Sequence, residues 1–362
     1  MHAGNDIEPD QDHELEALSQ RFVASSGTDP DAVVVPRTGN AGHTQVETLF
    51  SLEPELDAAE VESLAGVSPD VLDKVTRALG LPASTESGRL YTYADVDLVR
   101  GAWDIVATFP DREVGFRLLR VVASSLARSA EAAVAAYNDA VQRPLWEKRV
   151  TRLRHARAQA AAIRNIKQFS DQLGTLFLHH SAAAVRRARV ARLQSSDLDS
   201  SVMAVGFVDV VGFTPMSHEL PITELVDFIA EFETLAFETA VDHGGMIVKH
   251  VGDEVMFVAI DPVAACGIAI SLVERARSSS SITPHAGVAY GNLISSGGDY
   301  YGVEVNLAAR LADVAVPYEV LASTELAVET QRRSDAFGFE AAGRRSLKGF
   351  PDPVDVFSLL RS

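Results

Sequence analysis

The spacing of apolar residues divides the chain into two halves of different character. Between residues 46 and 193, apolar side chains recur at every third or fourth position, which predicts an all-helical region whose last part, 145–193, forms long helices. Residues 1–45 are rich in Asp, Glu, Gly, Pro and Thr without periodicity, so we expect a disordered acidic tail. The polar run at 194–201 predicts a linker between the helical region and the remainder.

The remainder, residues 202–362, combines strand and helix patterns. It opens with a continuous apolar run, typical of a buried central strand, and two β-rich runs later meet at Gly252-Asp253, which is the pattern of a hairpin. Helices are predicted at 221–242, 262–277 and 303–315, and further strands at 285–290, 320–322 and 354–357. This order predicts an α+β fold in which a ferredoxin-like βαββαβ domain follows an all-α domain.

Composition narrows the functional classes. Apolar residues make up 47 % of the 362 residues, enough for a sizeable core, and the net charge of −18 argues against a general nucleic-acid binder. The charge is uneven, because residues 143–192 carry twelve Lys or Arg against two acids. The single cysteine, Cys266, cannot form an internal disulfide. No apolar run approaches the ~20 residues of a membrane helix and the first residues lack a signal-peptide core, so we expect no transmembrane segment and a cytoplasmic protein.

Two aspartates stand at strand ends, where folding rarely requires a carboxylate. Asp209 follows the first apolar run, and Asp253 occupies the tip of the predicted hairpin. If these strands are neighbours, the two carboxylates can hold two divalent ions, which clamp a triphosphate and activate a hydroxyl nucleophile. Taken alone, Asp209 also fits a turn or helix-capping residue.

Three further side chains add candidate chemistry. Lys249 lies on the first hairpin strand between apolar neighbours, where a lysine either needs a partner or extends its ammonium group past the sheet edge. Asn306 and Arg310 are four residues apart, so they share one face of a predicted helix. Arg310 can stabilise charge on a transferring phosphorus and Asn306 can orient a ribose or phosphate oxygen, although alone the pair also fits an ordinary solvated face.

In this order and at similar intervals, the stretches 207–214, 249–255 and 298–311 resemble class III nucleotidyl cyclases, and the resemblance covers about 199–360. It implies two metal ions in each active site, Mg²⁺ or Mn²⁺, and a role for each matching residue. The implied metal ligands are Asp209, Asp253 and the backbone carbonyl of Val210. The implied purine contacts are Lys249 and Asp299, and the implied transition-state contacts are Asn306 and Arg310. The other implied substrate contacts are Lys348, Phe213 and Thr214.

The implied purine pair favours ATP. Adenine offers an amine donor and a ring-nitrogen acceptor, which match the carboxylate of Asp299 and the ammonium group of Lys249, whereas guanine reverses both. The implied reaction is attack of the ribose 3′-hydroxyl on the α-phosphorus, which gives cyclic AMP and pyrophosphate. Sites of this family form between two catalytic domains, and this chain holds both sets of residues, so the resemblance implies a homodimer.

The helical region leaves alternatives open. It resembles the regulatory and dimerisation domains of soluble bacterial cyclases, some of which respond to pH. His155, His179 and His180 lie among basic residues that disfavour a protonated imidazole, so they are either pH-sensing groups or simple interface or surface histidines. The basic segment 143–192 is either a charged helix that links the domains, which we prefer, or a surface that touches anionic lipid.

Two other functional classes compete with the cyclase interpretation. Residues 60–100 resemble the helix-turn-helix and wing of MerR-type regulators, so the alternative function is DNA-linked transcriptional regulation. Residues 60–120, however, carry ten acids against seven bases, and we therefore expect no nucleic-acid partner. The stretch Gly252-Asp253-Glu254 superficially resembles diguanylate cyclases, but Val251 and Val255 stand where their Gly-Gly-Asp-Glu-Phe signature has Gly and Phe.

Overall fold

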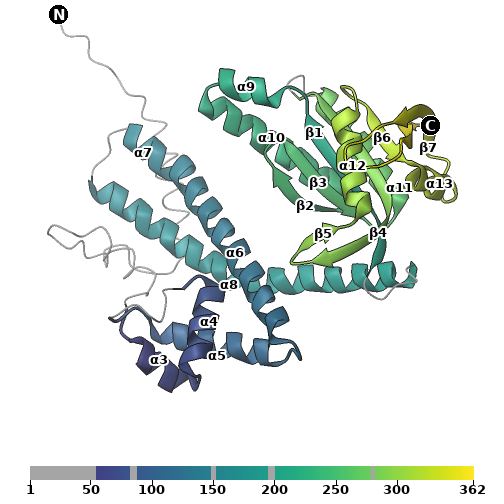
Figure 1. Cartoon of the computed structure of the whole chain (residues 1–362). Helices are drawn as coiled ribbons and strands as arrows, with labels where there is room; N and C mark the ends of the chain where they lie inside the picture. The colour runs from purple at the N-terminus through teal and green to yellow at the C-terminus, as the bar shows by residue number, and fades with distance from the viewer. Residues whose placement is uncertain (1–53, 82–87, 148–151, 195–199, 279–281) are drawn as a thin grey trace, which may run out of the picture. The chain divides into compact units, whose positions relative to one another are not determined.

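The computed structural model describes residues 54–81, 88–147, 152–194, 200–278 and 282–362 (Figure 1). They form two compact units, divided in the sequence between Leu178 and His179, and each unit is described by itself. The predicted tail, 1–45, and most of the predicted linker, 195–199, lie outside the described residues.

The N-terminal unit is helical, as the sequence predicts. The helix α3 begins with a capping box, in which the side chains of Asp57 and Glu60 each accept the main-chain N–H of the other at 2.9 Å. The helix α4 ends at Gly80, whose φ of 71° is the left-handed conformation that glycine adopts readily. The elements are α3 Ala58–Ala65, α4 Pro69–Leu79, α5 Tyr93–Ala107, α6 Arg112–Tyr137, the π-helix η2 Asn138–Gln142, α7 Arg143–Glu147 and α8 Arg152–Gln194, which continues into the second unit.

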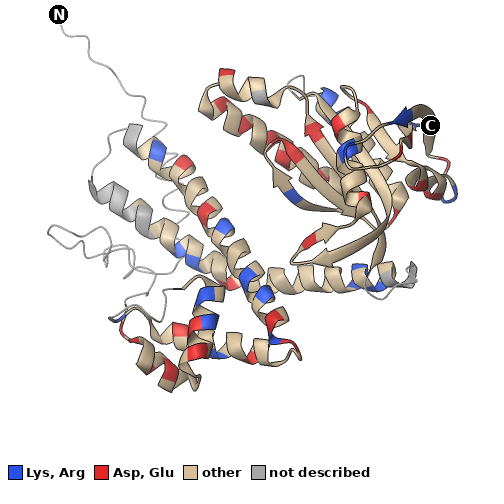
Figure 2. Cartoon of the chain, viewed as in Figure 1, with Lys and Arg blue, Asp and Glu red and all other residues tan. Residues whose placement is uncertain are grey.

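The helix pair α3 and α4 has the order of a helix-turn-helix. An antiparallel bridge between Leu56 and Tyr91 follows, at the position where the sequence predicts a wing. The helix α4, however, carries both blue and red segments in Figure 2. Each of its bases pairs with an acid one turn earlier, Lys74 with Asp70 at 2.8 Å and Arg77 with Asp73 at 2.9 Å. The helix therefore carries no net positive charge, which a helix in the major groove would need to neutralise phosphates.

The C-terminal unit is built on one sheet. Its strand order is β2-β3-β1-β4-β6-β8-β7, with β5 paired to β4, and every neighbouring pair is antiparallel except β4 with β6. The elements are β1 Ser201–Val210, α9 Phe213–Glu219, α10 Ile222–Asp242, β2 Met246–Val251, β3 Glu254–Ala259, α11 Pro262–Ser278, β4 Pro284–Ser296, β5 Asp299–Tyr301, α12 Val303–Val314, β6 Val320–Ser323, α13 Thr324–Gln331, β7 Phe337–Arg345 and β8 Val354–Arg361.

The first part of this unit confirms the predicted βαββαβ domain. The strands β1, β2, β3 and β4 alternate with α10 and α11 in that order, and the predicted hairpin is the pair β2 and β3. The segments α9, β5, α13 and β7 were not predicted. The predicted strand 285–290 is longer in the structure, because β4 continues to Ser296 and pairs there with β5.

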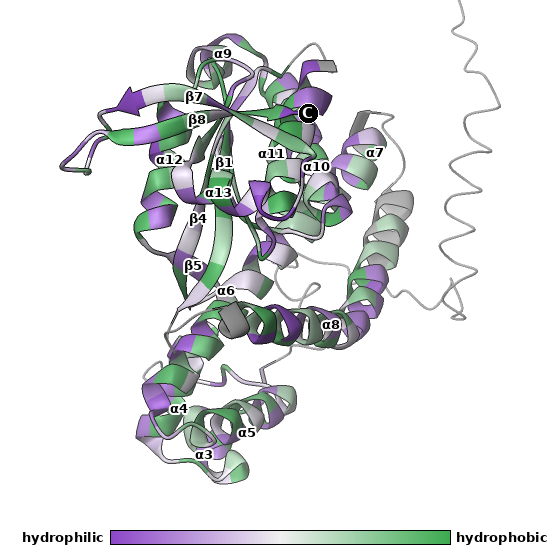
Figure 3. Cartoon of the chain, turned by 90° about the vertical axis from the view of Figure 1, so that its right-hand side faces the viewer, coloured by the Kyte–Doolittle hydropathy of each residue, from purple (hydrophilic) through white to green (hydrophobic). Residues whose placement is uncertain are grey.

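Both faces of the central strands β1 and β3 are buried, which explains the continuous apolar run of β1. One face packs against α10 and α11 through residues such as Val208, Phe232 and Ile268, and α11 is largely apolar (Figure 3). The other face packs against α12 and the end of α8, where Ala191 is 1 % exposed. Alternate residues of β1 therefore serve two cores.

A glycine on β4 sets the position of α12. A Cβ atom at Gly287 would lie 2.2 Å from the main-chain oxygen of Ala308 and 2.2 Å from the main-chain nitrogen of Ala312. Only a residue without a side chain allows the helix to approach the strand this closely. Within the described ranges, no helix combines the length and the apolar character needed to cross a bilayer.

Candidate functional site

The two predicted metal ligands lie at the same end of neighbouring strands. Asp209 is the penultimate residue of β1, and Val208 before it pairs with Val255 of β3. Asp253 lies in the turn that opens β3, where Gly252 has a φ of 65°, a conformation that permits the tight reversal. The sheet therefore brings together two carboxylates that are 44 residues apart in the sequence, 209 and 253.

Burial and neighbouring negative charge act on the acids near Asp209. Burial and the neighbouring charge of Asp209 raise the pKa of Asp253 to about 6. Burial and the charges of Asp209, Asp313 and Asp253 raise the pKa of Glu254 to about 6 as well. Such a cluster of acids gains stability from a cation.

The structure adds a residue that sequence reasoning missed. His285 lies opposite Asp209 in the antiparallel pair of β1 and β4, and its Nε2 atom is 3.3 Å from Oδ2 of Asp209. Its Nδ1 atom is 2.8 Å from the main-chain oxygen of Ala315. The contact with Asp209 raises the pKa of His285, against the opposing effect of burial. Only the strand register, which no local pattern encodes, could have revealed this contact.

The two predicted purine contacts pair with each other. Nζ of Lys249 on β2 lies 2.5 Å from Oδ2 of Asp299 on β5, and the main-chain N–H of Tyr300 donates to Oδ1 of Asp299 at 2.8 Å. The Lys249 side chain is 41 % exposed, so it is a partly solvated lysine with a partner rather than a buried one. An ion pair this open to solvent contributes little to stability, which leaves both groups available to a ligand.

The predicted transition-state pair lies on one face of α12. Leu307 and Leu311 point into the core, and Asn306 is exposed on the opposite side. Arg310 pairs with Asp313, one turn further on. Among the described residues, no hydrogen bond or ion pair joins Asn306 or Arg310 to Asp209 or Asp253.

The remaining predicted residues occupy three places. Val210 is the last residue of β1, directly after Asp209. Phe213 opens α9 and packs partly buried against Phe228, with ring centroids 6.1 Å apart. Thr214 belongs to α9, but its side chain lies outside the described part. Lys348 is exposed in the turn between β7 and β8.

The residues at the strand ends fit divalent cations. Hard ions such as Mg²⁺ take oxygen ligands, often from only one or two carboxylates with substrate phosphates and water completing the shell. The two carboxylates and the carbonyl at Val210 supply this chemistry. Within the described residues, no three His, Cys, Asp or Glu side chains surround one metal position. A site of this kind does not require three.

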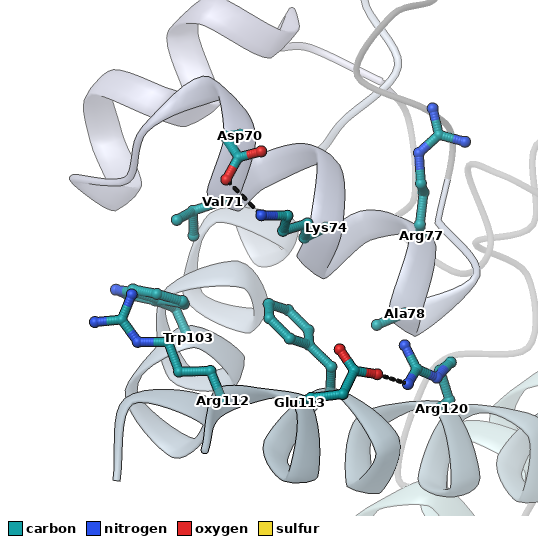
Figure 4. Close-up of a pocket in the computed structure, with 10 residues that line it drawn as sticks. Asp70, Val71, Lys74, Arg77, Ala78, Trp103, Arg112, Glu113 and Arg120 are labelled. Carbon is teal, nitrogen blue, oxygen red and sulfur yellow. Dashed lines mark hydrogen bonds and ion pairs between the residues drawn. The ribbon is translucent and has the colours of Figure 1, made fainter. Parts of the chain in front are cut away.

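A pocket of about 410 Å³ lies between α4, α5 and α6 of the N-terminal unit (Figure 4). The ion pairs of Lys74 with Asp70 and of Arg120 with Glu113 line it. The guanidinium group of Arg112 lies 5.0 Å from the ring centroid of Trp103. None of the residues predicted for the cyclase site lines this pocket, which is therefore separate from that site.

Comparison with known proteins identifies relatives across most of the chain. No family model matches. An adenylate cyclase of Glutamicibacter nicotianae is 31 % identical over 333 residues, which cover 84 % of this chain and 81 % of the relative. A pH-sensitive adenylate cyclase of Mycobacterium tuberculosis is 27 % identical over 315 residues, 84 % of this chain and 78 % of the relative. Among solved structures, the adenylyl cyclase CyaB from P. aeruginosa is 26 % identical, with a TM-score of 0.41, and the match covers 44 % of this chain and 94 % of that chain.

The match to the Glutamicibacter protein includes the helical region as well as the sheet domain, because it spans more than four-fifths of both chains. The motifs at 207–214, 249–255 and 298–311 lie within the sheet domain. The chain therefore belongs to the class III adenylate cyclase family.

Proposed function

We propose that this protein converts ATP to 3′,5′-cyclic AMP and pyrophosphate, with two divalent metal ions, at a site shared by two copies of the chain. The observation that carries the proposal is the pair Asp209 and Asp253 at one sheet end, where burial and the charge of Asp209 raise the pKa of Asp253 to about 6. A carboxylate pair with this unfavourable charge is suited to bind cations.

The metal ligands would be Asp209, Asp253 and the main-chain carbonyl of Val210. Divalent cations bound there would favour ionisation of the ribose 3′-hydroxyl and neutralise the triphosphate. Lys348 and Arg310 would add positive charge at the phosphates, and Asn306 would orient the ribose or a phosphate oxygen. Phe213 and Thr214, next to the metal-binding strand end, would contact the substrate.

Base selection would rest on Lys249 and Asp299. The 2.5 Å contact between them already places a donor beside an acceptor. The adenine amine can donate to the carboxylate, and adenine N1 can accept from the ammonium group. Guanine would face each group with the wrong polarity, which leaves both polar groups unsatisfied.

The proposal of a homodimer is supported by the lack of a hydrogen bond or ion pair, among the described residues, between the two residue sets within one chain. Asn306 and Arg310 make no described contact with the aspartates that would hold the reacting phosphate. A two-fold axis would bring this face of α12 to the aspartates of a second copy and create two equivalent sites.

The main test is ATP turnover by the full chain with Mn²⁺ or Mg²⁺, compared with the Asp253→Ala variant. We expect cyclic AMP from the wild type and a loss of at least about 100-fold in the variant, because one metal-binding carboxylate is gone. The matched control is Asp352→Ala, since Asp352 is an exposed aspartate in the turn before β8. A wild type that forms no cyclic AMP with either metal would refute the proposal.

We further propose that the helical region regulates the catalytic domain. The end of α8 belongs to the catalytic unit, where Arg187 approaches the sulfur of Met246 at 3.2 Å and Ala191 is buried. Displacement of α8 would therefore act directly on the start of β2, the strand that carries Lys249. The relative from Mycobacterium tuberculosis that is named pH-sensitive makes pH a candidate stimulus, and anionic lipid at the basic segment is the alternative.

The histidines of α8 offer a test of the pH hypothesis. His179 and His180 are exposed, whereas the side chain of His155 lies outside the described part. We expect the double substitution His179→Gln and His180→Gln to shift the pH profile of activity if these groups sense protons. An unchanged profile would remove them from the regulatory hypothesis.

A further inference from the structure

His285 contacts a predicted metal ligand, Asp209, but is not itself one of the predicted ligands. It lies directly opposite Asp209 in the register of β1 and β4, so the two side chains leave the same face of the sheet as neighbours. The distance from Nε2 to Oδ2 of Asp209 is 3.3 Å. The His285 side chain is 12 % exposed and that of Asp209 is 37 % exposed, so the ring forms the buried side of the contact.

The ring is held from both ends. Its Nδ1 atom lies 2.8 Å from the main-chain oxygen of Ala315. This carbonyl and the carboxylate of Asp209 both accept only, so the two contacts together are those of the protonated imidazole, in which both ring nitrogens donate. Ala315 caps the end of α12 through bonds from its own N–H to the carbonyls of Leu311 and Ala312. The imidazole is thus anchored to a packed helix, and Nε2 faces the carboxylate in a fixed position.

We propose that His285 is a positioning residue that holds the carboxylate of Asp209 in one orientation for the divalent cation. Oδ2 is restrained by the ring, so the carboxylate does not have to be ordered anew when a cation binds. Partners that orient ligating groups in this way typically change metal affinity by about 10- to 100-fold when they are removed. This inference rests on the proposed function, because it assumes that Asp209 binds metal.

Two substitutions separate positioning from a merely structural role. His285→Asn keeps an amide donor near the place of Nδ1, and can bond to Ala315, but ends short of Asp209. His285→Gln places its amide nearer the position of Nε2, within reach of the carboxylate. If the contact with Asp209 matters, His285→Asn weakens cation binding by about 10- to 100-fold, and His285→Gln weakens it clearly less.

The readout is Mn²⁺ binding to the full chain, measured from the electron paramagnetic resonance signal of the free ion. The titration contains 3′-deoxy-ATP, which lacks the attacking hydroxyl, so the result does not depend on turnover. The control is His243→Asn, which also removes an imidazole contact, from Nε2 to Ser271 Oγ at 3.0 Å, in the same unit. We expect the control to leave Mn²⁺ affinity unchanged. Equal Mn²⁺ affinity in wild type, His285→Asn and His285→Gln would overturn the inference, whatever their melting temperatures.

Mixed dimers give a second, independent test. Combining an Asp253→Ala chain with an Arg310→Ala chain leaves one complete site, whose metal ligands all come from the Arg310→Ala chain. Adding His285→Asn to that chain should raise the Mn²⁺ concentration for half-maximal activity, and adding it to the Asp253→Ala chain should not. An equal effect from both placements would overturn the positioning role. A parent mixture without activity would instead count against the shared site, and the Mn²⁺ titration would still decide the role of His285.

Discussion

The substitution Asp299→Asn tests base selection with the smallest change of shape. Asp299 and Lys249 form a contact of 2.5 Å, with side chains 27 % and 41 % exposed. The substitution preserves the size of the side chain and removes one negative charge. An amide can also rotate, so that it offers either an acceptor to the adenine amine or a donor to the guanine oxygen.

The magnitude follows from the hydrogen bonds involved. A bond to a charged group contributes about 1.5–3 kcal/mol and a neutral one about 0.5–1.5 kcal/mol, so the substitution removes about 1 kcal/mol from the adenine contact. That loss lowers kcat/KM for ATP by about 5-fold. For GTP, the carboxylate of Asp299 and the guanine oxygen are both acceptors, whereas the amide of the replacement side chain can donate to that oxygen. The substitution Asp299→Asn therefore removes a cost of about 1–3 kcal/mol for unpaired polar groups, and it raises kcat/KM for GTP by about 5-fold or more. The ratio of kcat/KM for ATP to kcat/KM for GTP should therefore fall by at least about 25-fold.

The assay is steady-state kinetics with ATP and with GTP, with the cyclic nucleotides separated by chromatography. Asp299→Ala is the informative comparison, because it lowers ATP turnover without offering a donor to guanine. If the Asp299→Asn variant folds normally and keeps the wild-type ratio of kcat/KM for ATP to kcat/KM for GTP, then Asp299 does not contact the base. Base selection would then have to rest on other residues.

Three other predictions concern charge and packing. At a subsaturating Mn²⁺ concentration, activity should fall as the pH drops through about 6, where Asp253 becomes protonated. Saturating Mn²⁺ should move this fall to lower pH, because the cation favours the carboxylate. A KM for Mn²⁺ that is equal at about pH 5.5 and about pH 7.5 would contradict this prediction. Because the pKa of Asp253 is raised above its unfolded value of 3.8, its charge destabilises the folded state above about pH 6, so Asp253→Asn should raise Tm at pH 7.5 and lose this advantage below about pH 4. Gly287→Ala should lower the free energy of unfolding by about 1–3 kcal/mol in urea titrations, because its Cβ atom would lie 2.2 Å from the backbone of α12, and an unchanged midpoint would show that the helix can move away at little cost.

Elements with a strong local pattern could be predicted from the sequence. The hairpin at Gly252 is an example, since two apolar runs meet at a glycine whose φ is 65°. The amphipathic helix predicted at 221–242 is α10, Ile222–Asp242, because its apolar positions face the sheet. Both elements carry the burial pattern within their own residues, so the period alone identifies them.

Elements made by distant pairing could not be predicted in this way. The strand β5 has three residues, and it exists only because Ile294 to Ser296 of β4 pair with it. The predicted strand stopped at residue 290, because Gly291 and Asn292 interrupt the β pattern, whereas the ladder with β1 continues to Leu293. His285 escaped notice for the same reason, since its contact is 76 residues away in the sequence.

The packing of α12 supports the proposal that one chain does not assemble the whole site alone. Gly287 draws the helix close to β4 and buries Leu307 and Leu311. That orientation fixes Asn306 and Arg310 on the solvent side of the helix, where Arg310 pairs with Asp313 rather than with Asp209 or Asp253. A helix held this tightly keeps Asn306 and Arg310 in these positions unless it loses its core contacts. We therefore infer that the groups that bind the metals and the groups that stabilise the reacting phosphorus come together only when a second copy supplies the missing set.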